Sequence, residues 1–327
     1  GPVRTVSAAA GRRDGYRPLS RNHGAGPAAA GRRAGPRQRL AGHRRWRPAY
    51  RPAGPAADLS LPGLVPFTEA DRPFFFGRKS FTVRLVEAVR QQPLVAVVGP
   101  SGSGKTSVVN AGLLPWLRHH NFTLPVAPEP AGQSPAATPA GKTGWTIASF
   151  RPAGYPCRAL AGALISLLEP HLGETERLLA AGKLASSFCR GDLTLPDVID
   201  RILAKSPSGH RFLLVVDQFE ELFTQVPEPE ERQHFLAILL EPLLARHAAA
   251  GRVRIVLTLR VDLLGHVLAH PPLANALQES TLILGPMTRQ EHVRVISQPA
   301  AGQGVSFEAG LVERILDDVG SQPGQLP

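Results

Sequence analysis

The sequence lacks several features that define whole classes of protein. It has no run of 18 apolar residues, so no membrane-spanning helix is predicted, and no apolar segment typical of a secretory signal. Its only cysteines, Cys157 and Cys189, have a spacing that matches no metal or redox motif, so we expect reduced thiols. His266 and His270 lie four residues apart without the glutamate of a zinc-protease motif. These absences favour a cytoplasmic protein without a histidine metal site.

Lysine is scarce, and the net charge of +11 is concentrated in one arginine-rich segment. Residues 1–57 contain 13 arginines, no lysine and one acid, Asp14, whereas the rest of the chain contains 24 basic and 25 acidic residues. Of these 57 residues, 42 are Ala, Arg, Gly or Pro, and large apolar residues are few, so the segment cannot bury enough surface to offset the entropy cost of ordering. We therefore interpret residues 1–57 as a disordered leader. The alternative is an arginine-rich arm that contacts nucleic acid or acidic surfaces.

From Leu94 onward, short apolar runs alternate with helical patterns, which predicts an α/β domain with a parallel sheet. The stretch 124–144 is rich in Pro, Ala and Gly and is predicted to be a flexible surface loop. The five predicted strands are 94–98, 145–150, 212–216, 253–259 and 281–284. Predicted helices cover about 104–118, 157–168, 195–204, 230–247, 288–297 and 307–319, and the stretch TRQE at 288–291 is a capping box.

The stretch VVGPSGSGKTSVV at 97–109 contains the pattern G-x-x-x-x-G-K-[ST] between a predicted strand and a predicted helix. Its glycines let the backbone curl so that N–H groups and the helix dipole point at phosphate oxygens. Lys105 is expected to reach the β- and γ-phosphates, and the Thr106 hydroxyl is expected to ligate Mg²⁺. The predicted nucleotide contacts of this loop are Gly99, Pro100, Ser101, Gly102, Ser103, Gly104, Lys105, Thr106 and Ser107.

Two similar patterns do not carry this function. A dinucleotide-binding fingerprint needs glycine at position 107, where this chain has Ser107. A second Gly-Lys-Thr, at 141–143, has Ala136 where a phosphate loop needs glycine. The sequence therefore predicts a single phosphate-binding loop.

The stretch LLVVDQFEELF at 213–223 places an acid directly after an apolar strand. An acid at this place holds Mg²⁺ in phosphate-loop proteins, and Asp217 fits that role, with a helix N-cap as the alternative. Glu220 or Glu221 is expected to orient the attacking water, unless both are simply solvated beside packed neighbours.

Arg260 lies at the end of the predicted strand 253–259, at the sheet edge where ligands bind in open parallel sheets. A guanidinium there can contact the γ-phosphate through two hydrogen bonds. The alternative is a salt bridge with Asp262 or another nearby acid.

The order of these motifs resembles the STAND class of P-loop NTPases, particularly the bacterial group novel STAND NTPase 1. The resemblance covers residues 61–327, about four-fifths of the chain. It rests on LPGLVPFTEADRPFFFGR at 61–78, GPSGSGKTS at 99–107, LLVVDQFEELF at 213–223, LTLRVD at 257–262, GPMTRQEHVRVISQPA at 285–300 and PGQLP at 323–327.

This resemblance implies a three-layer P-loop sandwich over 58–286, with a five-stranded parallel sheet in the order 5-1-4-3-2. The start of a helical lid follows over 287–327, and because the chain ends where the family's G-x-P element begins, we expect a fragment. Arg260 takes a sensing role in the family. The nucleotide base is expected near Phe76, Gly77, Arg78 and Pro327.

The resemblance also implies a function. Such proteins are signalling switches that bind Mg-ATP or Mg-ADP, hydrolyse ATP slowly and form homo-oligomers with ATP bound. They act in signalling, regulation or antiphage defence, with fused sensor repeats such as WD40 or an effector domain, and no membrane partner is implied. Two departures stand out: Lys79 replaces a common glutamate, and Gln218 occupies the place of the catalytic glutamate of many related ATPases, which favours slow hydrolysis.

Two other functions fit parts of the sequence. An ATP-driven nucleic-acid remodeller would use the arginine-rich arm, but the near-neutral remainder of the chain does not favour it. A small-molecule kinase needs a segment that binds the acceptor, and none is visible. We therefore expect the nucleotide-operated switch.

Overall fold

The computed structural model describes residues 65–119, 144–244 and 251–319. The predictions for the leader 1–57, for nearly all of the loop 124–144 and for Pro327 concern residues outside these ranges. Within them, no helix is both long enough and apolar enough to cross a bilayer.

The described strands form one parallel sheet of five members, close to the predicted ranges. They are β1 (Leu94–Gly99), β2 (Trp145–Phe150), β3 (Arg211–Val216), β4 (Val253–Arg260) and β5 (Thr281–Ile283). Their order across the sheet is β2-β3-β4-β1-β5. This is the predicted order 5-1-4-3-2 counted from the opposite edge, so the predicted fold class is confirmed.

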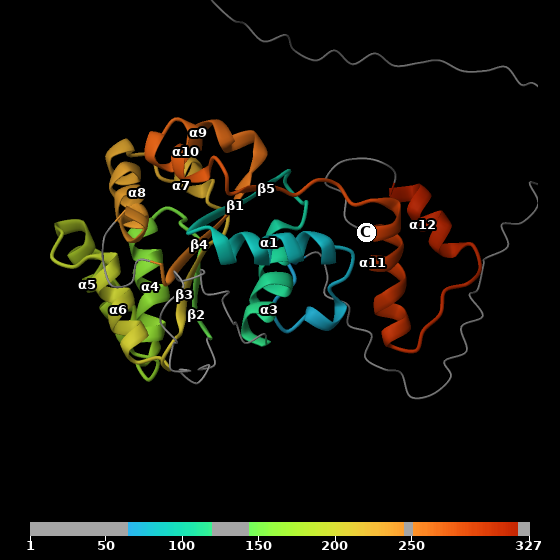
Figure 1. Ribbon diagram of the computed structural model, residues 1–327, viewed down its shortest axis with the longest axis horizontal. Helices are drawn as coiled ribbons and strands as arrows, with labels where there is room; N and C mark the ends of the chain where they lie inside the picture. The colour runs from blue at the N-terminus through green and yellow to red at the C-terminus, as the bar shows by residue number, and fades with distance from the viewer. Residues whose placement is uncertain (1–64, 120–143, 245–250, 320–327) are drawn as a thin grey trace, which may run out of the picture. The chain divides into compact units, whose positions relative to one another are not determined.

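Helices connect the strands and continue after the last one (Figure 1). The longer ones are α1 (Lys79–Gln91), α4 (Pro156–Leu168), α5 (Glu174–Arg190), α6 (Leu195–Ala204), α8 (Pro229–Leu244), α11 (Arg289–Gly302) and α12 (Leu311–Val319). The shorter ones are η1 (Arg72–Phe74), α2 (Lys105–Ser107), η2 (Val108–Leu113), α3 (Leu114–His119), α7 (Glu221–Thr224), η3 (Val261–Leu263), α9 (Leu264–Leu268) and α10 (Pro271–Leu277).

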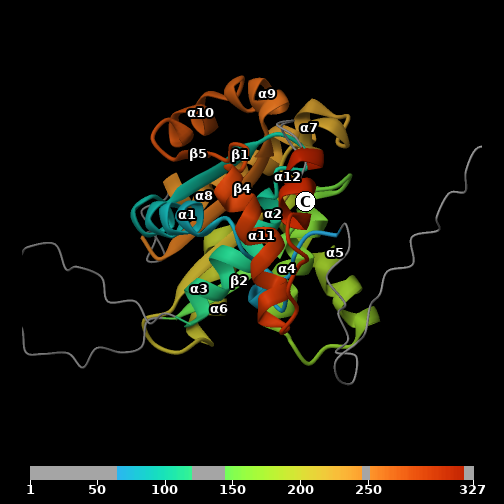
Figure 2. The same ribbon diagram turned by 90° about the vertical axis from the view of Figure 1, so that its right-hand side faces the viewer.

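The sheet separates two hydrophobic cores, which makes the domain three-layered (Figures 1 and 2). Side chains alternate between the faces of a strand, and in β1 Ala96 and Val98 enter one core while Val95 and Val97 enter the other. The first core contains residues of α4, α5, α6 and α8, and the second contains residues of α1, η2 and α3. Because both faces are covered, the strands are almost continuously apolar.

Three features of the helices differ from the prediction. The expected helix over 104–118 is divided by η2, a π-helical segment. Helix α1 was not predicted, although Phe81, Leu85 and Val89 give it a helical apolar period. Helix α5 was not predicted either, because alanines form much of its buried side and Leu179 is exposed. The apolar period of α5 is therefore weak in the sequence.

Candidate functional site

The candidate site lies at the edge of the sheet where the parallel strands end. Strand register places Gly99 beside Arg260 and Phe150 beside Val216. The residues that follow these ends therefore gather at one edge, which is where open parallel sheets bind ligands. The phosphate loop, Arg151 and Asp217 all follow strands at this edge.

The phosphate loop adopts a curled backbone that depends on glycine. Gly104 has a φ of 86°, in the left-handed region, where residues with a Cβ are strained. At Gly99, a Cβ would lie 2.8 Å from the carbonyl oxygen of Leu284 and 2.9 Å from Oγ of Ser103. The loop can therefore close only with glycine at both positions, as the sequence pattern requires.

The side chain of Lys105 is buried inside this curl. Its ammonium donates hydrogen bonds to the carbonyl oxygens of Gly99, at 3.0 Å, and Pro100, at 2.7 Å. Burial lowers the pKa of Lys105, and the charge of Glu220 is the largest effect that opposes this shift. The loop thus holds a cation at the centre of its backbone.

Asp217 is the best-connected side chain of the site, although it is only 7% exposed. Its Oδ1 accepts hydrogen bonds from the hydroxyls of Thr106, at 2.7 Å, and Thr258, at 2.8 Å. Its Oδ2 accepts a hydrogen bond from Nε of Arg151 at 3.0 Å. The two predicted metal-site residues, Thr106 and Asp217, are therefore in direct contact, and the buried carboxylate is fully paired.

Arg151 and Thr258 were not among the predicted site residues. Arg151 directly follows β2, and Thr258 lies in β4, two residues before its end. Their position at the ligand-binding ends of strands was a usable signal, because polar side chains there face the site. Their bonds to Asp217 required the three-dimensional arrangement of three strands.

The chain makes a strained turn directly after Asp217. Gln218 has a φ of 53°, in the left-handed region, which costs about 1–2 kcal/mol for a residue with a side chain. The N–H of Gln218 donates to the hydroxyl of Thr258 at 2.8 Å. Thr258 therefore holds both the carboxylate and the turn that follows it.

The structure separates the two glutamates that the sequence could not distinguish. Glu220 is 8% exposed, and its Oε2 has no hydrogen-bond partner among the described residues. Burial raises the pKa of Glu220, and backbone hydrogen bonds together with the charge of Lys105 oppose this shift. Oε2 of Glu221 accepts a hydrogen bond from the N–H of Ala153 at 3.2 Å. Glu220 thus has a free buried oxygen near Lys105, whereas Glu221 supports the loop after β2.

Arg260 forms the salt bridge that was the alternative to a phosphate contact. Its Nε and Nη2 donate to the two carboxylate oxygens of Asp262, at 3.1 and 2.7 Å. The pair is accessible to solvent at the end of β4.

The segment before α1 packs against the phosphate loop and α11. Nη2 of buried Arg78 donates to the carbonyl oxygen of Ser103 at 3.2 Å, and the N–H of Phe67 donates to Oγ of Ser107 at 3.2 Å. Gly77 packs so closely on α11 that a Cβ would lie 2.5 Å from Val295. Among the predicted base-side residues, Arg78 therefore contacts the loop, Gly77 contacts α11, and the neighbouring Phe76 is half-buried.

A glycine-rich loop whose threonine meets a strand-end aspartate, on a sheet of this order, is the organisation of the P-loop NTPases. The chain is a P-loop NTPase nucleotide-binding domain. More closely, it belongs to the novel STAND NTPase 1 family, whose sequence model matches residues 61–327. The resemblance found in the sequence is thereby confirmed.

Three solved structures have a similar backbone. The Walker-type ATPase PABY2304 of Pyrococcus abyssi has a TM-score of 0.48 at 14% identity, over 79% of this chain and 67% of its own. The ORC2 protein of Aeropyrum pernix, in ADPNP-ADP complexes, has a TM-score of 0.45 at 16% identity, over 68% of this chain and 52% of its own. Cdc6p from Pyrobaculum aerophilum has a TM-score of 0.39 at 14% identity, over 77% of this chain and 59% of its own. No curated protein matches the sequence.

The role of Thr258 can be tested by stability. We expect Thr258→Val to lower the free energy of unfolding by about 1–3 kcal/mol, because Gln218 N–H loses its acceptor and Asp217 loses a donor. Urea unfolding measures this change. Thr258→Ser keeps the hydroxyl and loses only a methyl group, so its cost should be smaller. A valine variant as stable as the parent would contradict the bridging role.

Proposed function

We propose that this domain is the nucleotide-operated core of a signalling switch that binds Mg-ATP or Mg-ADP and hydrolyses ATP slowly. The observation that carries the proposal is the contact between Thr106 of the phosphate loop and Asp217 of β3. It joins the element that would hold phosphates to the element that would hold the metal. Membership of the novel STAND NTPase 1 family supports the switching role.

The oxygen set at this contact fits a magnesium ion. Mg²⁺ prefers oxygen ligands and commonly keeps several waters, with one or two protein groups and the nucleotide phosphates completing its shell. The Thr106 hydroxyl would bind the ion, and Asp217 would hold it through its water shell. When bound, the ion would neutralise charge that develops on the β- and γ-phosphates.

Glu220 is the residue that we assign to orienting the attacking water. A general base works best when its pKa approaches the ambient pH, and burial shifts the pKa of Glu220 in that direction. Its unpartnered Oε2 leaves an acceptor for a water molecule. Glu221 already accepts from Ala153, so we assign it to supporting the loop.

Arg260 would exchange its partner during switching. A fully exposed salt bridge contributes little to stability, so release from Asp262 is inexpensive when a γ-phosphate offers a stronger partner. Reversing a population from 1:99 to 99:1 needs about 5.5 kcal/mol of differential binding. We therefore propose that Arg260, Lys105 and the metal act together with a lid domain.

In the whole protein, we propose that ATP binding promotes homo-oligomerisation and that a fused sensor, such as WD40 repeats, or an effector domain gives the switch its input and output. The family supports this part of the proposal.

Nucleotide binding at the phosphate loop is tested by Lys105→Ala. We expect this variant to lose measurable ATP and ADP binding in calorimetry, because the loop loses the cation that would contact the β- and γ-phosphates. Lys183→Ala, on the exposed side of α5, is the matched control and should bind like the parent. Equal affinity of the Lys105 variant and the parent would refute the site.

The division of roles between the two glutamates gives a second test. Glu220→Gln should lower ATP hydrolysis about 100-fold with binding retained, because an amide cannot accept the water's proton. Glu221→Gln, the matched control, should keep most of the activity. Equal losses in both variants, or a larger loss in Glu221→Gln, would contradict the assignment.

The same variants predict an effect of pH on stability. The folded-state pKa of Glu220 lies above its unfolded value, so the native state loses stability as pH rises through the two pKa values. Glu220→Gln should therefore raise the unfolding temperature near neutral pH, and this gain should vanish below about pH 4. Thermal unfolding across this range measures it, and a gain that does not depend on pH would contradict the carboxylate as its cause.

A further inference from the structure

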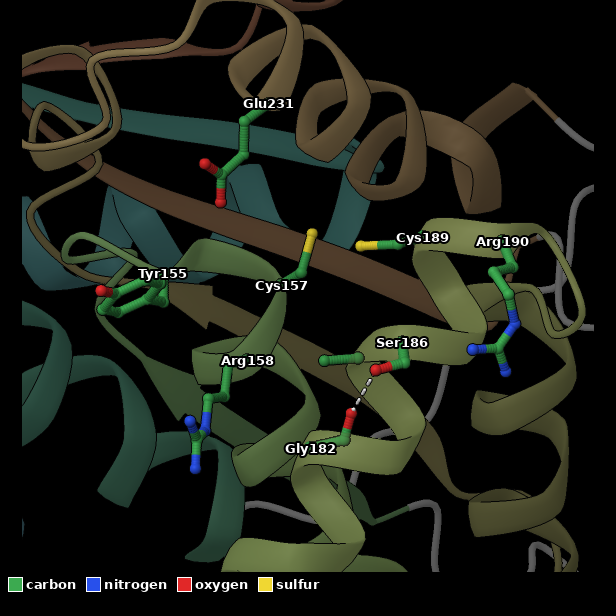
Figure 3. A pocket seen from close by; sticks show the side chains of 9 residues that line it. Tyr155, Cys157, Arg158, Gly182, Ser186, Cys189, Arg190 and Glu231 are labelled. Carbon is green, nitrogen blue, oxygen red and sulfur yellow. Dashed lines mark hydrogen bonds between the residues drawn. The ribbon is translucent and has the colours of Figure 1, made fainter.

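The two cysteines of the chain lie side by side although they are 32 positions apart in the sequence (Figure 3). Cys157 is in the first turn of α4 and is buried, whereas Cys189 is near the end of α5 and is exposed. Figure 3 shows the two sulfur atoms pointing toward one another from these helices. Cys189 is close enough to Cys157 to raise the pKa of the Cys157 thiol. The packing of α4 on α5 therefore creates a thiol pair that the spacing of the residues did not suggest.

A pocket of about 500 Å³ opens beside this thiol pair. Its lining combines residues of α4, α5 and α8, including Tyr155 just before α4, Arg158, Ser186, Arg190 and Glu231 (Figure 3). Pockets that bind small molecules have volumes of about 300–1,000 Å³, so this one is large enough for a small reagent at the exposed sulfur of Cys189. The thiol pair is therefore a built feature with its own access from solvent.

The two thiols differ in environment, and this difference sets an order of reaction. Burial raises the pKa of Cys157 to about 12, and the neighbouring Cys189 and Glu231 add to the shift. Cys157 therefore stays protonated, while Cys189 is the thiol that meets a reagent first. Once Cys189 is bound in a disulfide it can no longer carry a charge, so its repulsion of the Cys157 thiolate disappears.

We propose that Cys157 and Cys189 form a thiol–disulfide exchange site for low-molecular-weight disulfides of the glutathione type. The Cys189 thiolate attacks one sulfur of the disulfide, whose S–S bond breaks and releases one thiol. Cys157 then loses its proton and attacks the Cys189 sulfur, which releases the second thiol. The protein pair loses two electrons and two protons, and the small disulfide becomes two thiols. Excess reduced thiol reverses both steps.

The test uses the purified chain in mixtures of oxidised and reduced glutathione, with acid quenching, mass spectrometry and non-reducing peptide mapping. We expect an intramolecular Cys157–Cys189 disulfide. Its equilibrium constant should exceed that of the same chain unfolded in urea by at least about tenfold, because the fold raises the effective concentration of one thiol at the other. Equal constants in the folded and unfolded chains would overturn the proposal.

Two cysteine variants test the order of the steps. Cys157→Ala should stop at a glutathione adduct on Cys189, and Cys189→Ala should stay unmodified, since the remaining thiol is buried. Far-ultraviolet circular dichroism and thermal melting establish that each variant is folded. Rapid modification of Cys157 in the folded Cys189→Ala variant would overturn the order.

A substitution at Glu231 tests whether its charge controls the reactivity of Cys157. Glu231→Gln removes a negative charge that raises the pKa of Cys157, so closure of the mixed disulfide should accelerate and its pH profile should shift to lower pH. The rate at which Cys189 first reacts should change little. Glu230→Gln, one residue away and exposed, is the matched control. Identical closure kinetics in both variants would refute the part assigned to Glu231.

Discussion

The carboxylate of Asp217 is the interaction on which the rest of the site depends. A buried carboxylate without partners costs several kcal/mol. This one accepts hydrogen bonds from three residues, each on a different element. Thr106 brings the phosphate loop, Thr258 brings β4, and Arg151 brings the end of β2. The group best suited to a metal is thus also the group that fixes the relative positions of these elements.

The residues around Asp217 include some whose conformation or burial is energetically unfavourable. Gln218 and Ala153 both have left-handed φ values, and Glu220 is buried with one carboxylate oxygen unpaired. Strained residues and unpaired buried groups persist only where neighbouring structure holds them, and they cluster at functional sites. Here the hydroxyl of Thr258 holds the Gln218 turn and the carboxylate of Glu221 accepts from Ala153. Among the described acids of this site, Glu220 is the one that keeps a buried carboxylate oxygen without a partner.

The sequence pattern predicted the elements whose structure depends on residues close together in the chain. Continuous apolar runs gave the five strands because both faces of the sheet are covered, and the glycine spacing gave the loop around Lys105. Helix α5 was missed because buried alanines leave a weak apolar period. The hydrogen bond of Arg151 to Asp217 and the approach of the Cys157 and Cys189 side chains (Figure 3) join residues that are 66 and 32 positions apart. Such contacts arise from packing of whole elements, and no local pattern in one sequence encodes them.

A short stretch after β2 connects the two sites proposed for the domain. Arg151 donates to Asp217, Ala153 donates to Glu221, and Cys157 follows within the first turn of α4. Asp217 therefore contacts the first of seven consecutive residues, 151–157, and the last of them belongs to the thiol pair. Coupling between two sites is reciprocal. If a disulfide at Cys157 changes the affinity of the Asp217 site for a ligand through Arg151, then that ligand must shift the thiol–disulfide equilibrium by the same factor.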